Sequence, residues 1–442
     1  MIPFIKIITC CFLLLFQSAI YANNKIYVPF SDINELNLFI DEEEYKDFIR
    51  ASLFQQPEFN YINSLSAEEG FKLKFARRER FPTINGNIIN DESIERNISD
   101  NSSVRKRRDD SFDANIEIRQ NIYTGGSISS RIKSAKARVN ILGNEKQKTI
   151  SELIIEANKV YLNAVTSGFL LNYAENLINT LRPYKDRVKE RVNAGIMDPV
   201  ESALFSVRYN RLESLIYQLK SQAEKNSSRY KYFFKKDITR NAFPRIYTEY
   251  QSSLENSESY EVSISKSKYT EKKEEIKTVR SDYLPKLGLS ARYTKYDIDD
   301  DSNEDDIRGG LFFSMPIFSF GRGAAKINAA KASALGSKNN ISISKKDDAI
   351  NESSFISDYN NSIMNKEAFI SSFQDTVLQR KTLQERIEFS GFAINPLAEV
   401  ISNEISQLQI LLDNEAVSLI TYLSILHQNQ LLNNEFKIKV DR

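Results

Sequence analysis

The sequence predicts a mixed α/β chain that is mostly α, with two long antiparallel helical hairpins and four β-strands. Two stretches repeat apolar residues every three or four positions over far more residues than an ordinary helix, and shorter stretches alternate apolar and polar residues. One strand–turn–helix junction occurs twice, as QNIYTGGSISSRIKSAKARV at 120–139 and as MPIFSFGRGAAKINAAKASA at 315–334. Glycine is scarce, with 14 among 442 residues, which favours long helices over a many-turned β protein.

The first 22 residues have the layout of a secretory signal peptide. Lys6 precedes a short apolar run, and small or neutral residues follow as far as Ala22, after which we expect cleavage. A membrane anchor is the alternative, but the apolar run is too short to span a bilayer. Cys10 and Cys11 are the only cysteines and both lie in this leader, so the mature chain is expected to form no disulfide bond and no thiolate metal site.

The remaining chain is predicted to contain two structural repeats, residues 23–240 and 241–442. Each repeat begins with a charged helical segment, then has a β-hairpin and ends in a long helical hairpin. The charged segments lead into Phe81-Pro82 in the first repeat and Leu284-Pro285 in the second. Proline cannot continue a helix and favours an extended residue before it, so a strand is expected to follow each pair. The charged segments span about 41–80 and 252–279.

The strands are predicted from alternation. SFDANIEIRQNIY at 111–123 and KLGLSARYTKY at 286–296 place apolar and polar residues on opposite faces, and PTINGNII at 82–89 and RGGLFFSMPIF at 308–318 do so more weakly. An ordinary sheet on a soluble core would give this pattern. So would a membrane β-barrel wall, for which strands of about 10 residues are long enough. The polar face, which would line the barrel lumen, includes Asp113, Glu117, Arg119, Ser290 and Arg292.

A membrane barrel places a demand on the number of strands. Four strands cannot close a barrel of useful size, and open sheet edges are not tolerated in lipid. Membrane strands in this chain would therefore have to be shared between several copies of it.

Two long helices are predicted to follow the hairpins, at 127–193 and 324–389, each roughly 100 Å long at about 1.5 Å per residue. Glycines at the junctions provide the strand-to-helix turns, and Pro183 is expected to interrupt the first helix. Shorter antiparallel helices are expected to return at 199–234 and 396–436. The turn glycines are Gly125, Gly126, Gly321 and Gly323.

The ends of the two long helices share a pattern. RVNAGIMDPVESALF and IEFSGFAINPLAEVI each contain a glycine and then Asp or Asn followed by proline. Gly195 and Gly391 fit the position after a helix where φ is positive, and Asp198 and Asn395 fit N-caps with proline at the first helical position.

Taken together, these residues resemble the TolC-like outer-membrane efflux protein family. The resemblance rests on the IYTGG and IFSFGRG junctions, the apolar-proline strand entries, the RVNAGIMDP turn and the opening helix YKDFIRASLFQQPEFNYINS, and it covers about residues 40 to 435. It implies a homotrimer in the outer membrane of a Gram-negative bacterium. Each protomer would contribute four strands to a 12-stranded barrel and its helices to a long periplasmic tube.

The resemblance also implies a function and partners. The chain would be the passive exit duct of a tripartite efflux pump or a type I secretion system, in contact with outer-membrane lipid. A periplasmic adaptor (membrane fusion protein) would dock at the helix tips, and an inner-membrane ABC or proton-driven transporter would supply the energy. Family members often carry Asp residues after the second tip, and Glu399 or Glu404 would take their place at the gate here. The docking tips would include Arg191, Gly195, Asp198, Gly391 and Asn395.

Other chemistry finds little support in the sequence. Lysine and arginine number 60 against 59 acidic residues, a balance that argues against nucleic acid as a partner. A single histidine, His427, makes a transition-metal site improbable, and no Ser/His/Asp or Cys/His set is present for nucleophilic catalysis. We therefore expect no cofactor and no enzymatic activity. RKRRDD at 105–110 is interpreted as a solvated loop, with lipopolysaccharide contact as the alternative.

A soluble periplasmic coiled-coil adaptor or scaffold is the alternative function. The alternating strands argue against it, because an adaptor needs no lipid-facing surface. The sequence does not indicate the cargo.

Overall fold

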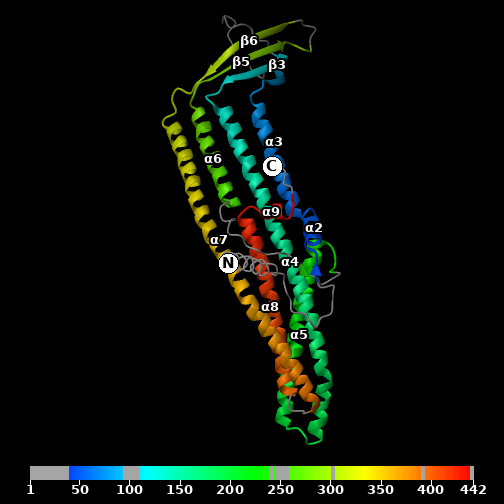
Figure 1. Cartoon of the computed structure of the whole chain (residues 1–442). Coiled ribbons are helices and arrows are strands. Elements are labelled where there is room, and N and C mark those ends of the chain that lie inside the picture. Colours follow the sequence, from blue (N-terminus) through cyan, green and yellow to red (C-terminus); the bar gives the residue numbers. More distant parts are fainter. Residues whose placement is uncertain are drawn as a thin grey trace, which may run out of the picture. The chain divides into compact units, whose positions relative to one another are not determined.

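The computed structural model describes most of the chain as helices and one main sheet (Figure 1). The predicted leader, Gly391 and the RKRRDD segment as far as residue 109 lie outside the described residues. The described residues are 39–92, 110–238, 243–244, 258–299, 304–389 and 394–438.

The chain divides into two compact units. Unit 1 contains the residues up to Tyr61, Lys146–Tyr260 and Asp347–Arg442, and unit 2 contains Ile62–Glu145 and Glu261–Lys346. Each unit takes segments from both predicted repeats. The repeats therefore remain a prediction about the sequence pattern, and they do not coincide with the compact units.

Unit 2 contains a four-stranded antiparallel sheet in the order β2-β3-β5-β6. The predicted hairpins are β2–β3 and β5–β6, and β3 pairs with β5 to join them. Proline ends the preceding helices, and alternating residues continue as strands, as the sequence predicts. The strands are β2 (Thr83–Glu92), β3 (Asp110–Tyr123), β5 (Lys286–Lys295) and β6 (Asp305–Ser314).

The helices of unit 2 follow the same order as the strands (Figure 1). Arg131 of α4 pairs with Glu79 after α3 at 2.7 Å, and Arg138 of α4 pairs with Glu271 of α6 at 2.7 Å. Ser265 of α6 contacts Ser344 of α7 at 2.7 Å between hydroxyl oxygens. Hydrogen bonds thus link α3 to α4, α4 to α6 and α6 to α7. The helices are α3 (Pro57–Arg78), α4 (Ser127–Asn193), α6 (Tyr260–Ser281) and α7 (Arg322–Phe389). All four also contain residues that belong to unit 1.

Glycine makes the strand-to-helix turns at three of the four predicted positions, Gly125, Gly126 and Gly321, whereas Gly323 lies inside the first turn of α7. Gly125 and Gly126 have φ of 61° and 87°, and α4 begins at the next residue. A Cβ on Gly125 would lie 2.8 Å from the Cβ of Leu284, so this position also needs a small residue. Gly321 has φ of 80° and α7 begins directly after it, two residues earlier than predicted.

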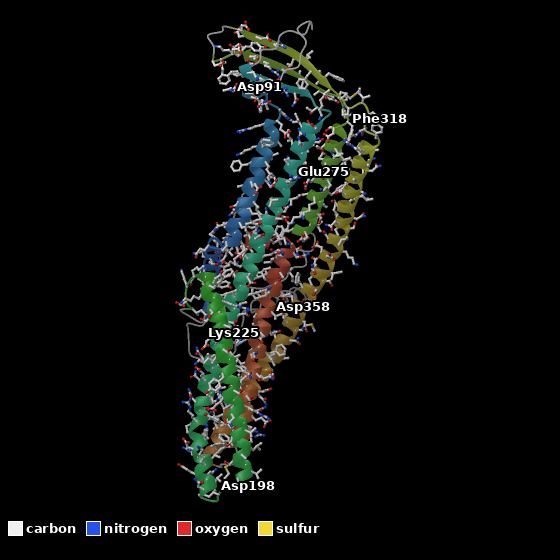
Figure 2. All side chains as sticks on the ribbon, turned by 180° about the vertical axis from the view of Figure 1, so that it is seen from behind. Asp91, Asp198, Lys225, Glu275, Phe318 and Asp358 are labelled. Carbon is white, nitrogen blue, oxygen red and sulfur yellow. The ribbon has the colours of Figure 1, made fainter. Side chains whose placement is uncertain are left out.

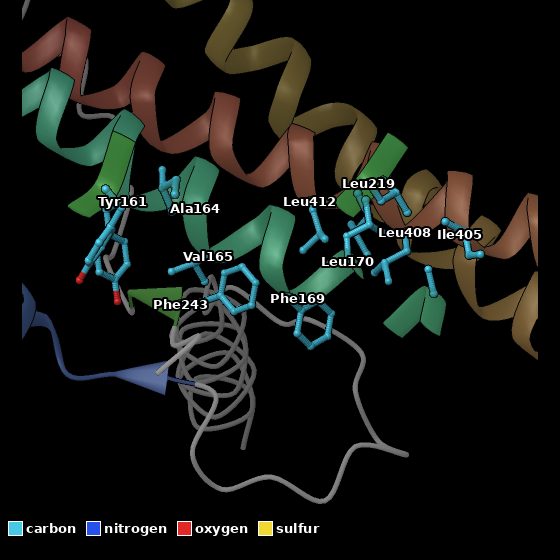
Figure 3. Close-up of a cluster of buried hydrophobic side chains, with 14 of the residues drawn as sticks. Tyr161, Ala164, Val165, Phe169, Leu170, Leu219, Phe243, Ile405, Leu408 and Leu412 are labelled. Atoms are coloured by element: carbon cyan, nitrogen blue, oxygen red, sulfur yellow. The ribbon is translucent and has the colours of Figure 1, made fainter. Parts of the chain in front are cut away.

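The core of unit 1 lies where α4, α5 (Pro199–Phe234) and α8 (Ile394–Gln428) pack together. Apolar residues of α8 recur with helical spacing, and Leu397 and Ile401 are fully buried. Figure 3 shows Leu408 and Leu412 of α8 beside the α4 helix that carries Leu170. A short parallel pair, β1 (Phe39–Ile40) with β4 (Phe243–Pro244), also belongs to this unit and was not predicted.

The opening segment is two helices, where the sequence predicts one. α2 (Glu42–Leu53) ends before Gln56, and Pro57 begins α3, because proline is suited to a first helical turn and not to a helix interior. The Gln56 amide donates to the carbonyl of Ser52 at 3.1 Å and to that of Phe233 at 2.9 Å. The side chain thus satisfies backbone carbonyls around the break.

Three other helix details differ from the predictions. α4 continues through Pro183, so this proline does not interrupt it. α8 begins at Ile394, which places Asn395 inside the first turn and not at the N-cap. α8 ends at Gln428 and not at the predicted residue 436, because Gln430 adopts a left-handed φ of 58°. A short helix, α9 (Leu432–Glu435), follows. Among the described residues, no helix combines the length and apolar character needed to cross a lipid bilayer.

Candidate functional site

The sheet of unit 2 has one apolar face, and that face is exposed. Cross-strand register places Ile84 opposite Ile118 and Leu289 opposite Leu311, with Ile307 opposite Tyr293. Ile307 is 78% exposed and Leu311 is 71% exposed. A contiguous exposed apolar patch marks a surface that contacts another protein or a membrane. The exposed apolar residues on this face are Ile84, Ile88, Ile116, Ile118, Leu289, Tyr293, Ile307, Leu311 and Phe313.

The opposite face of the same sheet carries polar and charged residues. Register places Glu117 directly opposite Arg292 and Arg119 directly opposite Ser290, so these four predicted residues share one face. Glu117 Oε1 accepts from Arg292 Nη2 at 2.9 Å and lies 3.1 Å from Arg119 Nη2. The structure therefore brings the predicted lumen residues of the two hairpins together.

Asp113 lies on the same face, nearer the hairpin loops. Its Oδ1 accepts a hydrogen bond from the backbone N–H of Asp297 at 3.2 Å. Asp113 thus helps to hold the end of β5 beside β3, in addition to adding charge to the polar face.

Arg308 also belongs to the polar face, and the sequence prediction missed it. It lies directly opposite Arg292, and its guanidinium contacts Asp306 on the same strand. The signal was weak because Gly309 and Gly310 interrupt the alternation of β6. Only the cross-strand register identifies which face Arg308 occupies.

The turn between α4 and α5 forms as predicted. Gly195 has φ of 70°, its N–H donates to the carbonyl of Val192 at 3.0 Å, and the N–H of Ile196 donates to the carbonyl of Arg191 at 2.9 Å. This pair of bonds caps the last carbonyls of α4. Figure 2 shows Asp198 at this turn, where its side chain accepts from the N–H of Val200 at 2.8 Å and caps α5.

The turn presents apolar side chains to solvent. Ile196 is 69% exposed and Val200 is 72% exposed, and Leu204 and Val207 continue the exposed stripe along α5 at helical spacing. The sequence prediction named the polar and glycine residues of this turn and missed the stripe.

The second turn is described in part, because Gly391 lies outside the described residues. The Asn395 side-chain amide donates to the carbonyl of Glu201 on α5 at 3.1 Å. Asn395 therefore links α8 to the beginning of α5, which is a different role from the predicted N-cap.

The two predicted gate residues occupy different environments. Glu399 is exposed and pairs with Arg208 of α5 at 2.9 Å. Glu404 is completely buried, where Arg380 Nε lies 2.7 Å from Oε2 and the Tyr173 hydroxyl donates to Oε1. A carboxylate enclosed in this way within unit 1 does not line a passage, so Glu404 is corrected to a residue of the packed interior.

Side chains that could bind a metal do not gather in the described part of the chain. No group of three His, Cys, Asp or Glu residues there is arranged to hold a metal ion. His427 contacts Ser151, with 2.8 Å between Nδ1 and Oγ.

Comparison with known proteins finds similar structures but no similar sequences. No protein-family model matches the sequence, and no curated protein matches it. Solved structures match over most of their length. The CmeC outer membrane channel of Campylobacter jejuni superposes with a TM-score of 0.77 at 13% identity, covering 88% of this chain and 87% of that one.

The chain has the TolC-like fold. VceC, an outer membrane protein of Vibrio cholerae, has a TM-score of 0.74 at 10% identity, with 88% of this chain and 96% of VceC covered. The open MtrE outer membrane channel of Neisseria gonorrhoeae has a TM-score of 0.62 at 14% identity, with 88% and 89% covered. At such low sequence identities, the similarity shows a shared fold. It confirms the TolC-like fold that the sequence motifs indicated.

Proposed function

We propose that this chain is the outer-membrane exit duct of a tripartite efflux pump or a type I secretion system. One observation carries the proposal: the sheet of unit 2 exposes a largely apolar face, while the other face carries most of its charged and polar residues. A membrane barrel needs this arrangement, with apolar side chains toward lipid and polar ones toward a water-filled lumen. The similar folds of CmeC, VceC and MtrE, which are outer-membrane proteins, support it.

The sheet has the properties required for sharing a barrel between copies. β5 and β6 each contain 10 residues, enough for a tilted strand to cross the hydrocarbon layer. β2 and β6 are the two edges, and antiparallel alternation continues if β6 of one copy pairs with β2 of the next. Three copies in a ring would give the 12-stranded barrel that the resemblance implies, with no open edge in lipid.

The helices would form a periplasmic tube whose far end closes at rest by packing of the helix tips. An adaptor would dock at these tips and favour an open arrangement, after which substrate would diffuse through the lumen. The exposed stripe from Ile196 to Val207, with Arg191 and Asp198 beside it, gives an apolar surface for docking. Glu399 is the remaining acidic candidate for the gate, since Glu404 is enclosed.

Energy would come from an inner-membrane ABC or proton-driven transporter that acts through the adaptor. The described residues offer no catalytic arrangement, and the similar structures are channels, so passive transport is the proposed role. A soluble periplasmic adaptor is not favoured, because a soluble protein gains nothing from exposing the apolar face of a four-stranded sheet.

Cell fractionation and size measurement test the proposal. We expect the full chain in the outer-membrane fraction, extracted only by detergent, as a heat-modifiable trimer that conducts ions in a planar bilayer. A monomer recovered from the periplasm without detergent would contradict the proposed function.

A further inference from the structure

The polar face of the sheet carries an excess of positive charge at two successive levels. Register aligns Asn85, Glu117, Arg292 and Arg308 across the four strands as one level. The next level, away from the hairpin loops, aligns Thr83, Arg119, Ser290 and Gly310. The two levels together contain three guanidinium groups and one carboxylate.

Pairing within the sheet leaves part of this positive charge without compensation. One oxygen of Glu117 is shared by Arg119 and Arg292, at 3.1 and 2.9 Å, so one carboxylate faces two guanidiniums. Arg308 contacts Asp306, which lies one level nearer the loops. Counting Asp306 as well, three positive groups face two negative ones over these three levels, and the next carboxylates on this face, Asp113 and Asp91, lie nearer the loops.

The arginines are accessible from the polar side. The side chains of Arg119, Arg292 and Arg308 are 56%, 49% and 76% exposed, whereas Glu117 is only 11% exposed. Water and dissolved ions on this side therefore meet guanidinium groups more than the carboxylate between them. Arg292 and Arg308 also lie directly opposite each other, and like charges in that position destabilise a sheet, so pairing of the strands does not account for both.

We propose that these arginines form a cationic belt that makes the barrel favour anionic over cationic solutes. The inference rests on the proposed function, in which this face lines a water-filled lumen. A ring of copies would repeat the belt at one level around the lumen, and rings of Arg or Lys side chains select anions in pores. Low-dielectric barrel walls concentrate such a field along the passage.

The belt predicts a measurable ion preference. Purified full-length oligomer is placed in a planar bilayer under a KCl gradient at low ionic strength, and the reversal potential gives the chloride-to-potassium permeability ratio. The double variant Arg119→Gln, Arg308→Gln removes two charges and keeps the Glu117–Arg292 pair. We expect its ratio to fall about two-fold or more, since a unit charge roughly 10 Å from an ion in water changes its population by about that factor.

Two further variants complete the test: one is expected to shift the permeability ratio in the opposite direction, and the other is the control. Glu117→Gln removes the carboxylate of the belt and is expected to raise the ratio. Lys295→Gln removes one positive charge from the other face of β5, since Lys295 aligns with Ala114 and Asp305, and is expected to leave the ratio unchanged.

The outcomes separate the inference from the proposed function. An unchanged ratio in the double variant, with normal conductance and oligomer size, would overturn the cationic belt alone, as would an equal shift in Lys295→Gln. Absence of any conductance from the wild-type oligomer would overturn the proposed function and the belt with it.

Discussion

Arg380 Nε lies 2.7 Å from Glu404 Oε2, and the Glu404 side chain has no exposed surface. The Tyr173 hydroxyl donates to the other carboxylate oxygen. Burial, followed by the charge of Glu404, raises the pKa of Tyr173, so the hydroxyl remains a donor at neutral pH. A buried carboxylate thus depends on two partners from two other helices.

Arg380→Met is expected to destabilise unit 1 by about 3–5 kcal/mol, because it leaves a buried carboxylate without its cation. The double variant Arg380→Met, Glu404→Leu should recover most of this loss, since it removes both charges. Urea-induced loss of the helical circular dichroism signal measures the effect. The exposed pair Arg208–Glu399 is the control, and Arg208→Met should cost no more than about 1 kcal/mol. Equal losses in the two single variants would contradict the importance of burial.

Tyr260 predicts an alkaline loss of stability. Its side chain is 2% exposed, and burial raises its pKa to about 12. The unfolded hydroxyl ionises near its usual pKa of about 10, so above that pH the folded state binds more protons than the unfolded state and the free energy of unfolding falls. The contribution is complete below about pH 10 and is lost by about pH 12, a change of up to roughly 2–3 kcal/mol.

Tyr260→Phe tests this pH dependence. The variant lacks the titrating hydroxyl, so its free energy of unfolding should fall less steeply than that of the wild type between pH 10 and 12. Parallel curves for the two proteins would show that Tyr260 does not contribute to the alkaline transition. Tyr232, which is 77% exposed, provides the matched control for substitution of a tyrosine by phenylalanine.

The two turn glycines predict unequal effects. Gly125→Ala places a Cβ 2.8 Å from the Cβ of Leu284 and 3.2 Å from the carbonyl oxygen of Ser281, whereas Gly126→Ala meets nothing within 4 Å. Both variants incur the roughly 1–2 kcal/mol cost of positive φ, and Gly125→Ala adds overpacking of about 1–3 kcal/mol. Thermal melting should rank Gly125→Ala below Gly126→Ala. The opposite ranking would contradict the close contact.

The two faces of β3 predict opposite tolerance to charge. Ile116→Lys places an ammonium on the apolar face and should cost about 2–4 kcal/mol if that face meets the middle of a bilayer. Asn115→Lys places it on the polar face and should be tolerated. Heat-modifiable oligomer recovered from the outer-membrane fraction is the measurement, and equal recovery of the two variants would contradict a lipid-facing sheet.

The turn between α4 and α5 predicts a docking defect without a folding defect. Ile196→Lys and Val200→Lys replace exposed side chains, so stability should change by no more than about 0.5 kcal/mol. Crosslinking to the adaptor in cells, and export, should both fall. Tyr217→Lys on the same helix, roughly 25 Å further along at about 1.5 Å per residue, is the control. Unchanged crosslinking in the turn variants would contradict docking at this stripe.

The features that the sequence predicted well depend on local signals. The bounds of α4 follow from glycine before it, glycine after it and continuous helical periodicity between them, and the predicted range agrees with the structure. The polar face of β3 follows from alternation, because a strand turns successive side chains to opposite sides. These signals act over a few residues and need no knowledge of the rest of the fold.

Other features depend on partners far away in the sequence. The burial of Glu404 requires Tyr173 and Arg380 from two other helices, and a carboxylate on a helix gives no sign of such partners. The membership of Arg308 in the polar face depends on its register with Arg292. The break before Pro57 had a local signal, proline, but the hydrogen bond from Gln56 to Phe233 that stabilises it is non-local.

The common order of strands and helices in unit 2 gives the molecule two unlike sides. One side ends in β2 and α3, and the other ends in β6 and α7. In the proposed ring, a neighbour that continues both layers would meet the first side with its second side, so the contact would be heterologous (head-to-tail) and not isologous. In the proposed ring, each copy would contribute its first side to one neighbour and its second side to the other, so all copies would point the same way around the axis. The strand layer and the helix layer of each copy would therefore both contribute to the contact with the next copy in the proposed ring.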